Sequence, residues 1–326
     1  MSNYQKVKLS IIIPIYNVGS YIKRCINSIL NQSFKEIEII VINDASTDNT
    51  DLIIQELLIN HPINYIKLPE NKGAGNARNI GLGISNGQYI SFIDGDDWID
   101  SNYYNIMISS IEKTGSDIAV SGTKTEFGSS FESIIRYKYD YENVITNEFA
   151  INLLSRVYSQ DSYITPIVCS KIFKSSLLKD NNLLFAENSF SEDDIFTFLS
   201  FVHAKSIVIV PNTYYHYYQR QNSITHTFSK KHIDDLVNSF IQLRSLLNNS
   251  NAFHMYKDSY WAFFKKCIQS NLSMIFKSEQ NIVIQKKFIA YFAEVCLNSF
   301  TLSECIELID INNLKLFFNL QNKVVF

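Results

Sequence analysis

Short apolar segments alternate with amphipathic ones along the first 121 residues of the chain. The apolar segments are rich in β-branched residues, which favours buried strands. The segments between them carry apolar residues at helical spacing, which predicts helices. Strands are expected at residues 9–14, 37–42, 63–68, 89–93 and 117–121, and helices at 20–32, 51–59, 76–85 and 102–113. This alternation predicts a Rossmann-like α/β fold, with a mostly parallel central sheet flanked by helices.

The pattern weakens after Gly122 and changes again near Lys230. Between these points we expect an irregular segment or ribbon at 127–145, a helix at 147–158, an apolar helix after Ser191, a strand at 206–210 and an aromatic ribbon at 214–220. Beyond Lys230 helical periodicity dominates, and further helices are expected at about 257–277 and 281–299. We therefore divide the chain into an α/β domain, residues 1–225, and a helical C-terminal extension, residues 226–326.

Composition and charge narrow the class of protein. The 326 residues are 46% hydrophobic and 19% charged, with a net charge of −3, which is ordinary for one or two globular domains. This near-neutral balance argues against a nucleic-acid partner. The five cysteines lack C-x-x-C spacing, so they indicate neither a disulfide framework nor a zinc site. Because there is no long apolar run and no signal-peptide segment, we expect a cytoplasmic protein, peripheral to a membrane at most.

The expected strand at 89–93 ends in Asp94-Gly95-Asp96-Asp97. Carboxylates placed this closely repel one another unless a cation, a ligand or open solvent compensates. At the carboxyl end of a parallel strand they would face the crevice where open α/β sheets bind ligands, and Asp44 ends another strand on the same side. One or two carboxylates with substrate phosphates commonly hold Mg²⁺. A solvated acidic turn that caps the next helix is the alternative interpretation.

Five segments taken together resemble the family 2 glycosyltransferases, which have the GT-A fold. They are Ser10–Asn17, Val41–Asp48, Asn71–Gly81, Phe92–Asp97 and the pair Glu192-Asp193. The first four occur in the family's order, and a weaker similarity runs to about residue 225. The resemblance implies that residues 1–225 form a GT-A glycosyltransferase domain. It also implies inverting transfer of a sugar from a nucleotide-diphosphate donor, usually a UDP-sugar, to a hydroxyl of a glycan or lipid-linked glycan acceptor.

The resemblance also implies a donor site. Asp44 would accept a hydrogen bond from the base, and Pro14, Tyr16 and Asn17 would form the wall on which the base packs. Arg78 would reach the nucleotide or its diphosphate, because a guanidinium can bind it bidentately. Gly73, in the loop that begins at Asn71, would let the backbone approach the ligand.

Asp94-Gly95-Asp96 matches the family's D-x-D motif. By this resemblance Asp94 faces the ribose or the metal, and Asp96 ligates Mn²⁺ or Mg²⁺ that bridges the two phosphates. The remaining residues implied near the sugar, the acceptor or the diphosphate are Asp97, Trp98, Glu192, His216 and Arg220. For Asp97, capping of the next helix is the alternative role.

Glu192-Asp193 matches the family's acidic pair before a helix, which makes Asp193 the implied general base. Inversion needs one carboxylate opposite the leaving group and no covalent intermediate. From the residues alone, the acids at 192–194 could equally stabilise the helix N-terminus through its dipole. Asp194 is adjacent, so an error of one residue would exchange the assignment.

Alternatives remain open for the C-terminal region and for the activity. The basic and aromatic run Trp261–Lys266 could contact a membrane surface or a partner, or could belong to the core of a helical bundle. A nucleotidyltransferase acting on sugar phosphates would need a Gly-rich basic loop after the first strand, and residues 14–19 carry no such cluster. A catalytically inactive nucleotide-sugar-binding scaffold would show a broken D-x-D or no base. Among active enzymes, we expect one that builds a bacterial surface polysaccharide, such as a capsule, a lipopolysaccharide or a wall polymer.

Overall fold

The structure is a computed structural model that describes residues 7–127, 133–156, 164–220, 228–279 and 281–308. The chain forms two compact units. The first comprises Met1–Ile151 and Tyr163–Gln221, and the second comprises Asn152–Ser162 and Asn222–Phe326. The functional boundary that we placed after residue 225 stays a prediction.

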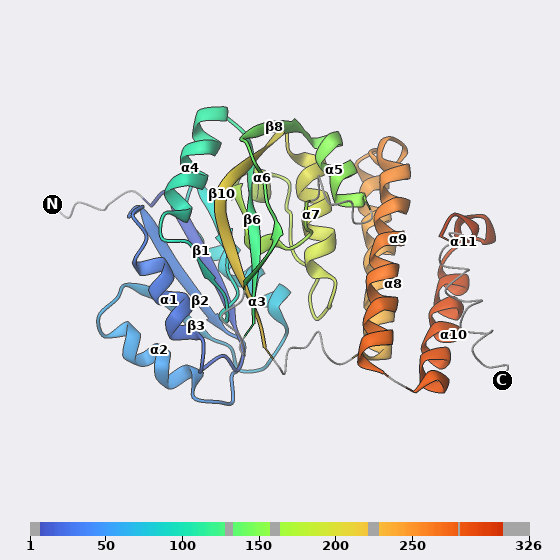
Figure 1. Ribbon diagram of the computed structural model, residues 1–326, viewed down its shortest axis with the longest axis horizontal. Coiled ribbons are helices and arrows are strands. Elements are labelled where there is room, and N and C mark those ends of the chain that lie inside the picture. The colour runs from blue at the N-terminus through green and yellow to red at the C-terminus, as the bar shows by residue number, and fades with distance from the viewer. Residues whose placement is uncertain (1–6, 128–132, 157–163, 221–227, 280, 309–326) are drawn as a thin grey trace. The chain divides into compact units, whose positions relative to one another are not determined.

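The first unit begins with four parallel strands in the order β3-β2-β1-β4. These strands are β1 (Leu9–Ile15), β2 (Ile37–Asn43), β3 (Ile63–Lys67) and β4 (Tyr89–Phe92), and the helices between them are α1 (Ile22–Leu30), α2 (Thr50–Leu58) and α3 (Ala74–Ile84). Figure 1 labels β1, β2, β3 and the helices α1, α2 and α3, in colours from blue to cyan. The alternation of apolar and amphipathic segments therefore gave the correct element order here.

The rest of the sheet is mixed. After β4 the strand order continues β9-β6-β10-β5, and β9 pairs antiparallel with both β4 and β6, whereas β10 is parallel to β6. The strands are β5 (Trp98–Ile99), β6 (Ile118–Phe127), β7 (Ser133–Tyr137), β8 (Asn143–Thr146), β9 (Lys171–Lys174) and β10 (Ser206–Gln219); the helices are α4 (Tyr103–Thr114), α5 (Asn147–Ser155), α6 (Ser175–Asp180) and α7 (Glu192–His203). The predicted fold class is confirmed.

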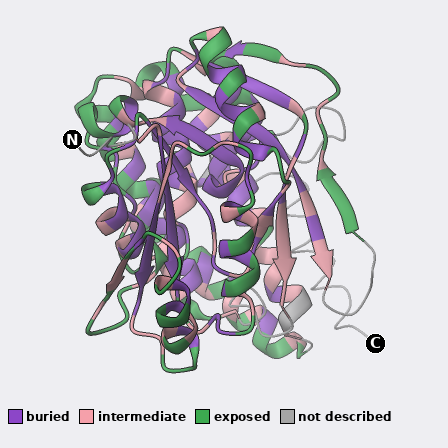
Figure 2. Ribbon diagram, turned by 90° about the vertical axis from the view of Figure 1, so that its left-hand side faces the viewer, coloured by how far each residue is buried: buried purple, intermediate pink, exposed green. Residues whose placement is uncertain are grey.

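Burial explains why the sheet forms and where it places the acids. Every residue of β1 and β4 is buried, and Figure 2 shows central strands in the buried colour. Helix α3 lies close to β1 because Gly81 has no side chain; a Cβ there would lie 2.4 Å from Cγ2 of Ile12. The carboxyl ends of β2 and β4 lie on either side of β1, so Asp44 and Asp94 follow strand ends at the same edge of the sheet.

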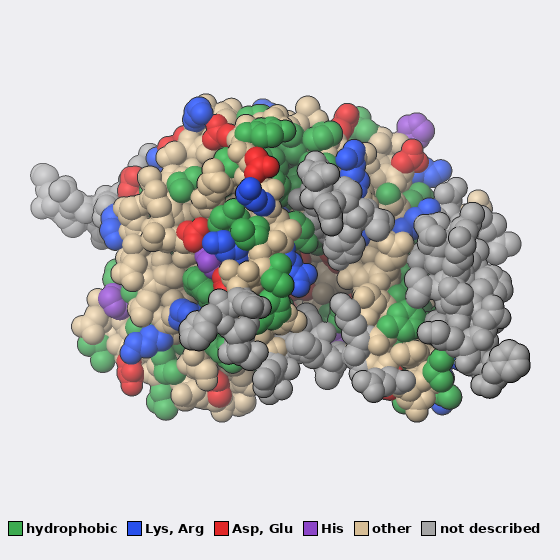
Figure 3. Space-filling model, in the orientation of Figure 1, with side chains coloured by type: hydrophobic (Ala, Val, Ile, Leu, Met, Phe, Trp, Pro, Cys, Tyr) green, Lys and Arg blue, Asp and Glu red, His purple; other side chains and the backbone are tan. Residues whose placement is uncertain are grey.

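The second unit contains α8 (Lys230–Asn249), α9 (Phe253–Ser278), α10 (Ile282–Ser299) and α11 (Leu302–Leu308). Its core is aromatic: the ring of Phe240 stacks on that of Phe264 with centroids 4.2 Å apart, and the hydroxyl of Tyr260 donates to the carbonyl of Phe240. None of the described helices is both long and apolar enough to cross a bilayer. Acidic and basic side chains are interspersed on the face of the first unit drawn in Figure 3.

Candidate active site

Arg78 joins two acidic motifs that lie far apart in the sequence. Its side chain, on α3, is only 4% exposed. Nη2 lies 2.9 Å from Oδ1 of Asp94, and Nη1 lies 2.9 Å from Oε1 of Glu192 and 3.1 Å from Oδ1 of Asp193. The structure therefore brings the first aspartate of the D-x-D motif together with the acidic pair at the start of α7. The buried Nε of Arg78 has no hydrogen-bond partner among the described residues.

The charges of this cluster do not balance, because three carboxylates surround one guanidinium. Burial alone would lower the pKa of Arg78, but Asp193 and Asp94 hold it well above its usual value. Burial raises the pKa of Asp193, although Arg78 opposes that shift. Burial and the neighbouring Asp193 raise the pKa of Glu192 to about 7. The cluster is therefore short of positive charge, which a proton or a bound cation can supply.

This shortage predicts a pH dependence of stability. The folded pKa of Glu192 is raised above its unfolded value, so between about pH 4.5 and 7 the folded state binds more protons at this residue. The free energy of unfolding should therefore fall as pH rises through this window, by at most about 3 kcal/mol from Glu192. Urea unfolding in EDTA at pH 5 and pH 7.5 measures this change. Glu192→Gln should lose less stability than the wild type between the two pH values, and an equal loss would contradict the assignment.

Asp96 and Asp97 differ in their surroundings. Oδ2 of Asp96 lies 2.6 Å from Nε of Arg220, and burial and Asp94 raise the pKa of Asp96 to about 6. Asp97 is 1% exposed; its Oδ1 accepts from the backbone N–H of Tyr218 at 2.7 Å, and its Oδ2 accepts from the hydroxyl of Tyr215. The same hydroxyl accepts from the backbone N–H of Asp94. Asp97 is thus placed to hold the loop in position, whereas Asp96 carries an ion pair that a ligand can displace.

Gly95 is required by the packing of this loop. A Cβ at this position would lie 2.8 Å from Cγ2 of Ile15 and 3.1 Å from Cγ2 of Val18. The loop after β4 therefore lies directly against the end of β1 and the segment that follows it.

Asp44 organises the loop that leads into α3. Its carboxylate is buried and accepts the backbone N–H groups of Lys72 and Gly73, each at 2.8 Å. Gly73 has a φ of +87°, which favours glycine, and its N–H also approaches the amide oxygen of Asn71. Since Arg78 lies on the helix that starts at Ala74, Asp44 also helps to place Arg78.

The expected base-binding wall lies at the ends of β1 and β2. Pro14 is buried within β1, and Tyr16 is 41% exposed just beyond the strand. The amide oxygen of Asn17 accepts the N–H of Thr47 at 2.8 Å, and the N–H of Asn17 donates to Oγ of Ser46. Asn17 therefore ties together the loops after the two strands and leaves the ring of Tyr16 accessible.

A stack of three side chains lies beside the acidic loop. The ring of Trp98 stacks on that of His216 with centroids 5.1 Å apart, and the guanidinium of Arg24 lies 3.8 Å from the Trp98 ring. The two ring nitrogens of His216 contact Asp100 at 2.8 Å and Glu126 at 2.7 Å. Arg24 also donates to the backbone carbonyl of Asp96.

Arg24 and Tyr215 are two residues of this site that we did not predict from the sequence. Arg24 sits at an exposed position of α1, and no local pattern marks it. Tyr215 belongs to the aromatic run of β10, where several tyrosines were equivalent by sequence. Only the pairing of β10 with β5, with Tyr215 opposite Ile99, places its ring beside the acidic loop.

The donor set of the acidic loop fits Mn²⁺ or Mg²⁺. Among the residues that the structure describes, no group of three His, Cys, Asp or Glu side chains forms a complete protein cage for a metal. Mg²⁺ is usually bound by one or two carboxylates together with substrate phosphates, so a complete cage is not required. Burial and the neighbouring Asp94 raise the pKa of Asp96, which means that they disfavour its charged form. A cation beside this carboxylate would stabilise the charged form.

The sheet order, with acids at the carboxyl edge of its parallel strands, matches the GT-A fold of the solved S. aureus TarS fragment. The model of the glycosyl transferase family 2 matches residues 10–180, more than half of the chain. The chain therefore belongs to glycosyl transferase family 2.

Two bacterial relatives extend this finding. Glycosyltransferase GlyA of Streptococcus pneumoniae is 31% identical over 247 residues, which are 74% of this chain and 35% of GlyA. The poly(ribitol-phosphate) beta-N-acetylglucosaminyltransferase TarS of Staphylococcus aureus is 29% identical over 215 residues, which are 65% of this chain and 35% of TarS. This chain thus matches only about a third of the length of either relative.

Solved structures show the same fold. The crystal structure of S. aureus TarS 1-349 superposes with a TM-score of 0.65 at 22% identity, covering 88% of this chain and 80% of that one. The complex of the same TarS fragment with UDP-GlcNAc gives a TM-score of 0.60 at 20% identity, covering 88% and 89%.

Proposed function

We propose that this chain transfers a sugar from a UDP-sugar to an acceptor hydroxyl with inversion at the anomeric carbon, and that Asp193 is the general base. The observation that carries the proposal is the buried Arg78, whose guanidinium contacts both the D-x-D aspartate Asp94 and the acidic pair Glu192-Asp193. A donor diphosphate at Asp94 and Asp96 would therefore lie close to a carboxylate that can accept the acceptor's proton. Family membership and the UDP-GlcNAc complex of TarS support a nucleotide-sugar donor.

The donor would bind along the carboxyl edge of β1, β2 and β4. Tyr16 would pack on the base, and Asp44 would accept from the base or hold the loop around Gly73 that faces the ligand. Asp96, and secondarily Asp94, would hold Mn²⁺ or Mg²⁺. When bound, the metal neutralises charge on the departing diphosphate. Arg220, which pairs with Asp96, could move from this carboxylate to a phosphate oxygen.

Asp193 is held in place on both of its oxygens. Oδ1 contacts Arg78, and Oδ2 accepts the backbone N–H of Val168 at 3.2 Å. In the reaction the acceptor oxygen forms a bond to the anomeric carbon and gives its proton to Asp193, while the bond from that carbon to the diphosphate oxygen breaks on the opposite face. The burial that raises the pKa of Asp193 makes it a better proton acceptor.

The acceptor class follows from the relatives. TarS is named as a poly(ribitol-phosphate) glycosyltransferase, and the Bacillus subtilis relative GgaB as a minor teichoic acid biosynthesis protein. We infer that the acceptor is a growing surface glycan or polyol-phosphate polymer, free or lipid-linked. Contact of the C-terminal helices with a membrane or a partner stays a prediction. Family membership favours a transferase of sugars over the alternative nucleotidyltransferase.

Donor binding can be tested by thermal unfolding. UDP with Mn²⁺ should raise the melting temperature by several °C, because a ligand that binds only the folded state stabilises it. Asp96→Ala should abolish this rise. Asp140→Ala, at an exposed carboxylate that pairs only with Lys138 among the described residues, is the matched control and should retain it. If UDP and UDP-sugars raise the melting temperature of the wild type equally with Mn²⁺ and with EDTA, the metal-assisted donor site is wrong.

Arg220→Met should separate binding of the metal from binding of the nucleotide. The 2.6 Å ion pair of Arg220 with Asp96 competes with a cation for the same carboxylate. Without nucleotide, the variant should bind Mn²⁺ about fivefold more tightly, which corresponds to about 1 kcal/mol. With saturating Mn²⁺ it should bind UDP more weakly than the wild type, because a phosphate contact is lost. Isothermal titration calorimetry measures both affinities, and unchanged Mn²⁺ affinity would refute the competition.

A further inference from the structure

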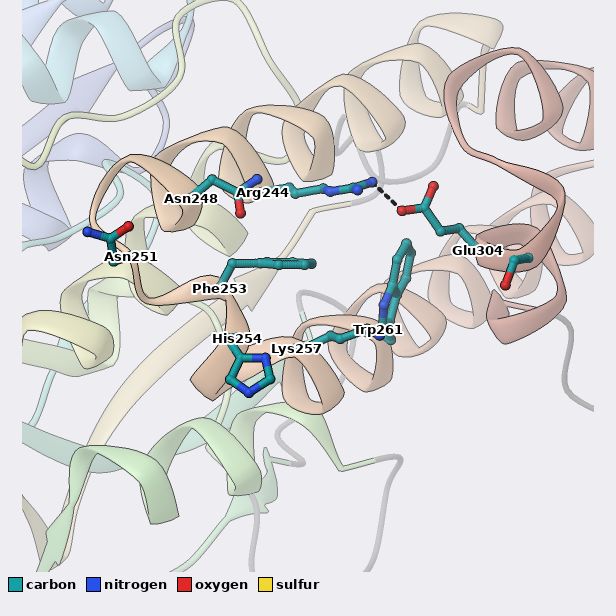
Figure 4. A pocket seen from close by; sticks show the side chains of 9 residues that line it. Arg244, Asn248, Asn251, Phe253, His254, Lys257, Trp261 and Glu304 are labelled. Carbon is teal, nitrogen blue, oxygen red and sulfur yellow. Dashed lines mark ion pairs between the residues drawn. The ribbon is translucent and has the colours of Figure 1, made fainter.

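Helices of the second unit line an open pocket of about 430 Å³. This volume lies within the range of about 300–1,000 Å³ that is usual for small-molecule sites. The lining side chains come from one face of α8, one face of α9, the turn between these helices, and α11 (Figure 4). They are Arg244, Asn248, Asn251, Phe253, His254, Lys257, Trp261, Ser303 and Glu304.

The polar groups of this pocket are suited to hydroxyl groups. Nη1 of Arg244 lies 2.6 Å from Oε1 of Glu304, and this ion pair presents donors and acceptors in a fixed arrangement. The side-chain amides of Asn248 and Asn251 each offer both a donor and an acceptor. Neighbouring hydroxyls on a sugar or polyol are themselves donors and acceptors, so they can bond to such groups in pairs.

Two aromatic rings complete the lining. Figure 4 shows the rings of Phe253 and Trp261 near the Arg244–Glu304 ion pair. Trp261 is 5% exposed, and its buried Nε1 has no hydrogen-bond partner among the described residues. A buried donor without a partner is unfavourable. A ligand oxygen beside the ring would offer the partner that the described side chains do not provide.

The charge of the pocket favours an anionic group. Arg244 is paired with Glu304, whereas Lys257 makes no ion pair with any other described residue. Lys257 and His254 are exposed and lie three residues apart on α9, so both can face the same ligand. One unpaired cation beside hydroxyl-binding groups matches a sugar or polyol that carries a phosphate or a carboxylate.

We propose that this pocket binds an acidic saccharide or polyol unit of the acceptor polymer, as an accessory site separate from the catalytic acids. The inference rests on the proposed function only in naming the acceptor as the source of the ligand. A second attachment point would keep the polymer at a high effective concentration between successive transfers.

Trp261 itself can report binding. The chain has two tryptophans, so Trp98→Phe leaves Trp261 as the single indole fluorophore. In this variant, glucose 6-phosphate should change the fluorescence saturably, with a dissociation constant of about 1 mM. Glucose and inorganic phosphate should each bind at least about tenfold more weakly, because each offers only part of the contacts. Lys257→Ala, introduced into the Trp98→Phe variant, should weaken glucose 6-phosphate binding by about tenfold. Lys287 is exposed on α10, and Lys287→Ala in the same variant should leave this binding unchanged.

Three results would overturn the inference. The first is no saturable fluorescence response to glucose 6-phosphate, and the second is an equal affinity for glucose 6-phosphate with and without Lys257→Ala. The third is inorganic phosphate binding as tightly as glucose 6-phosphate. The last result would define a simple anion site. The UDP and Mn²⁺ melting-temperature shift, measured on the wild-type protein, reports the proposed function separately. A normal UDP shift without a glucose 6-phosphate response overturns only the accessory site.

Discussion

Asp193→Asn should lower kcat by about 10²–10⁴-fold, the usual contribution of a general base. Asparagine keeps the shape of the side chain, and its single amide oxygen can still accept from either Val168 or Arg78, but it cannot take the acceptor's proton. UDP affinity should therefore be unchanged. In the wild type, kcat should rise with pH as Asp193 loses its proton, at a pH above that of an ordinary aspartate because burial raises its pKa. The variant should lack this rise.

Asp194→Asn is the matched control, because it changes the same residue type one position along α7. It should retain most of the activity. If Asp194→Asn loses the activity and Asp193→Asn keeps it, the base is Asp194 and the assignment is wrong by one residue. Single-turnover measurements with saturating donor separate this loss of chemistry from a loss of binding.

Arg78→Met should be the most destabilising single change in the site. It leaves the carboxylates of Asp94, Glu192 and Asp193 without their shared cation in a largely buried cluster. Removing one partner of a buried ion pair typically costs about 3–5 kcal/mol. Part of this cost should be recovered at low pH, where the carboxylates become protonated, and part with Mn²⁺ and UDP. Urea unfolding at pH 5 and pH 7.5 measures both effects.

Arg156→Met provides the control, since Arg156 is exposed and its Nε donates to the amide oxygen of Asn152. It should change the free energy of unfolding by less than about 0.5 kcal/mol. The free energy of unfolding of Arg78→Lys should lie between those of Arg78→Met and Arg156→Met. Lysine keeps the positive charge, but it lacks the planar guanidinium that contacts three carboxylates. An Arg78→Met protein as stable as the wild type at pH 7.5 would mean that the cluster is not electrostatically coupled.

The sequence predicted the parallel half of the sheet because each strand there is a β-branched apolar run bounded by an amphipathic helix. It also placed Asp44 and Asp94 at strand ends. It did not predict β9, a four-residue strand whose antiparallel place between β4 and β6 depends on pairing with distant segments. It separated residues 206–210 from the aromatic ribbon at 214–220, whereas the structure has one strand, β10, with an irregularity between Val210 and Tyr214.

The site shows a similar division. Motif spacing could name Arg78, Asp96 and Asp193, but not the contacts among them. Arg78 was expected at the nucleotide, and the structure gives it three carboxylate partners within the protein. Asp97 is expected near the sugar or the acceptor, which stays a prediction, and its oxygens accept from the hydroxyl of Tyr215 and the backbone N–H of Tyr218. These contacts arise from tertiary packing, so no local sequence pattern carries them.

A crystal structure with UDP and Mn²⁺, with the metal located by its anomalous signal, would show whether the donor diphosphate binds at the acidic loop. We expect a manganese peak beside the carboxylates of Asp96 and Asp94, with the diphosphate of UDP next to it. We also expect the uracil beside Asp44 and Tyr16. Asp193 should face the place of the donor sugar, on the side away from the diphosphate. A manganese peak away from Asp94 and Asp96, or UDP bound away from the edge of β1, β2 and β4, would show that the proposed donor site is wrong.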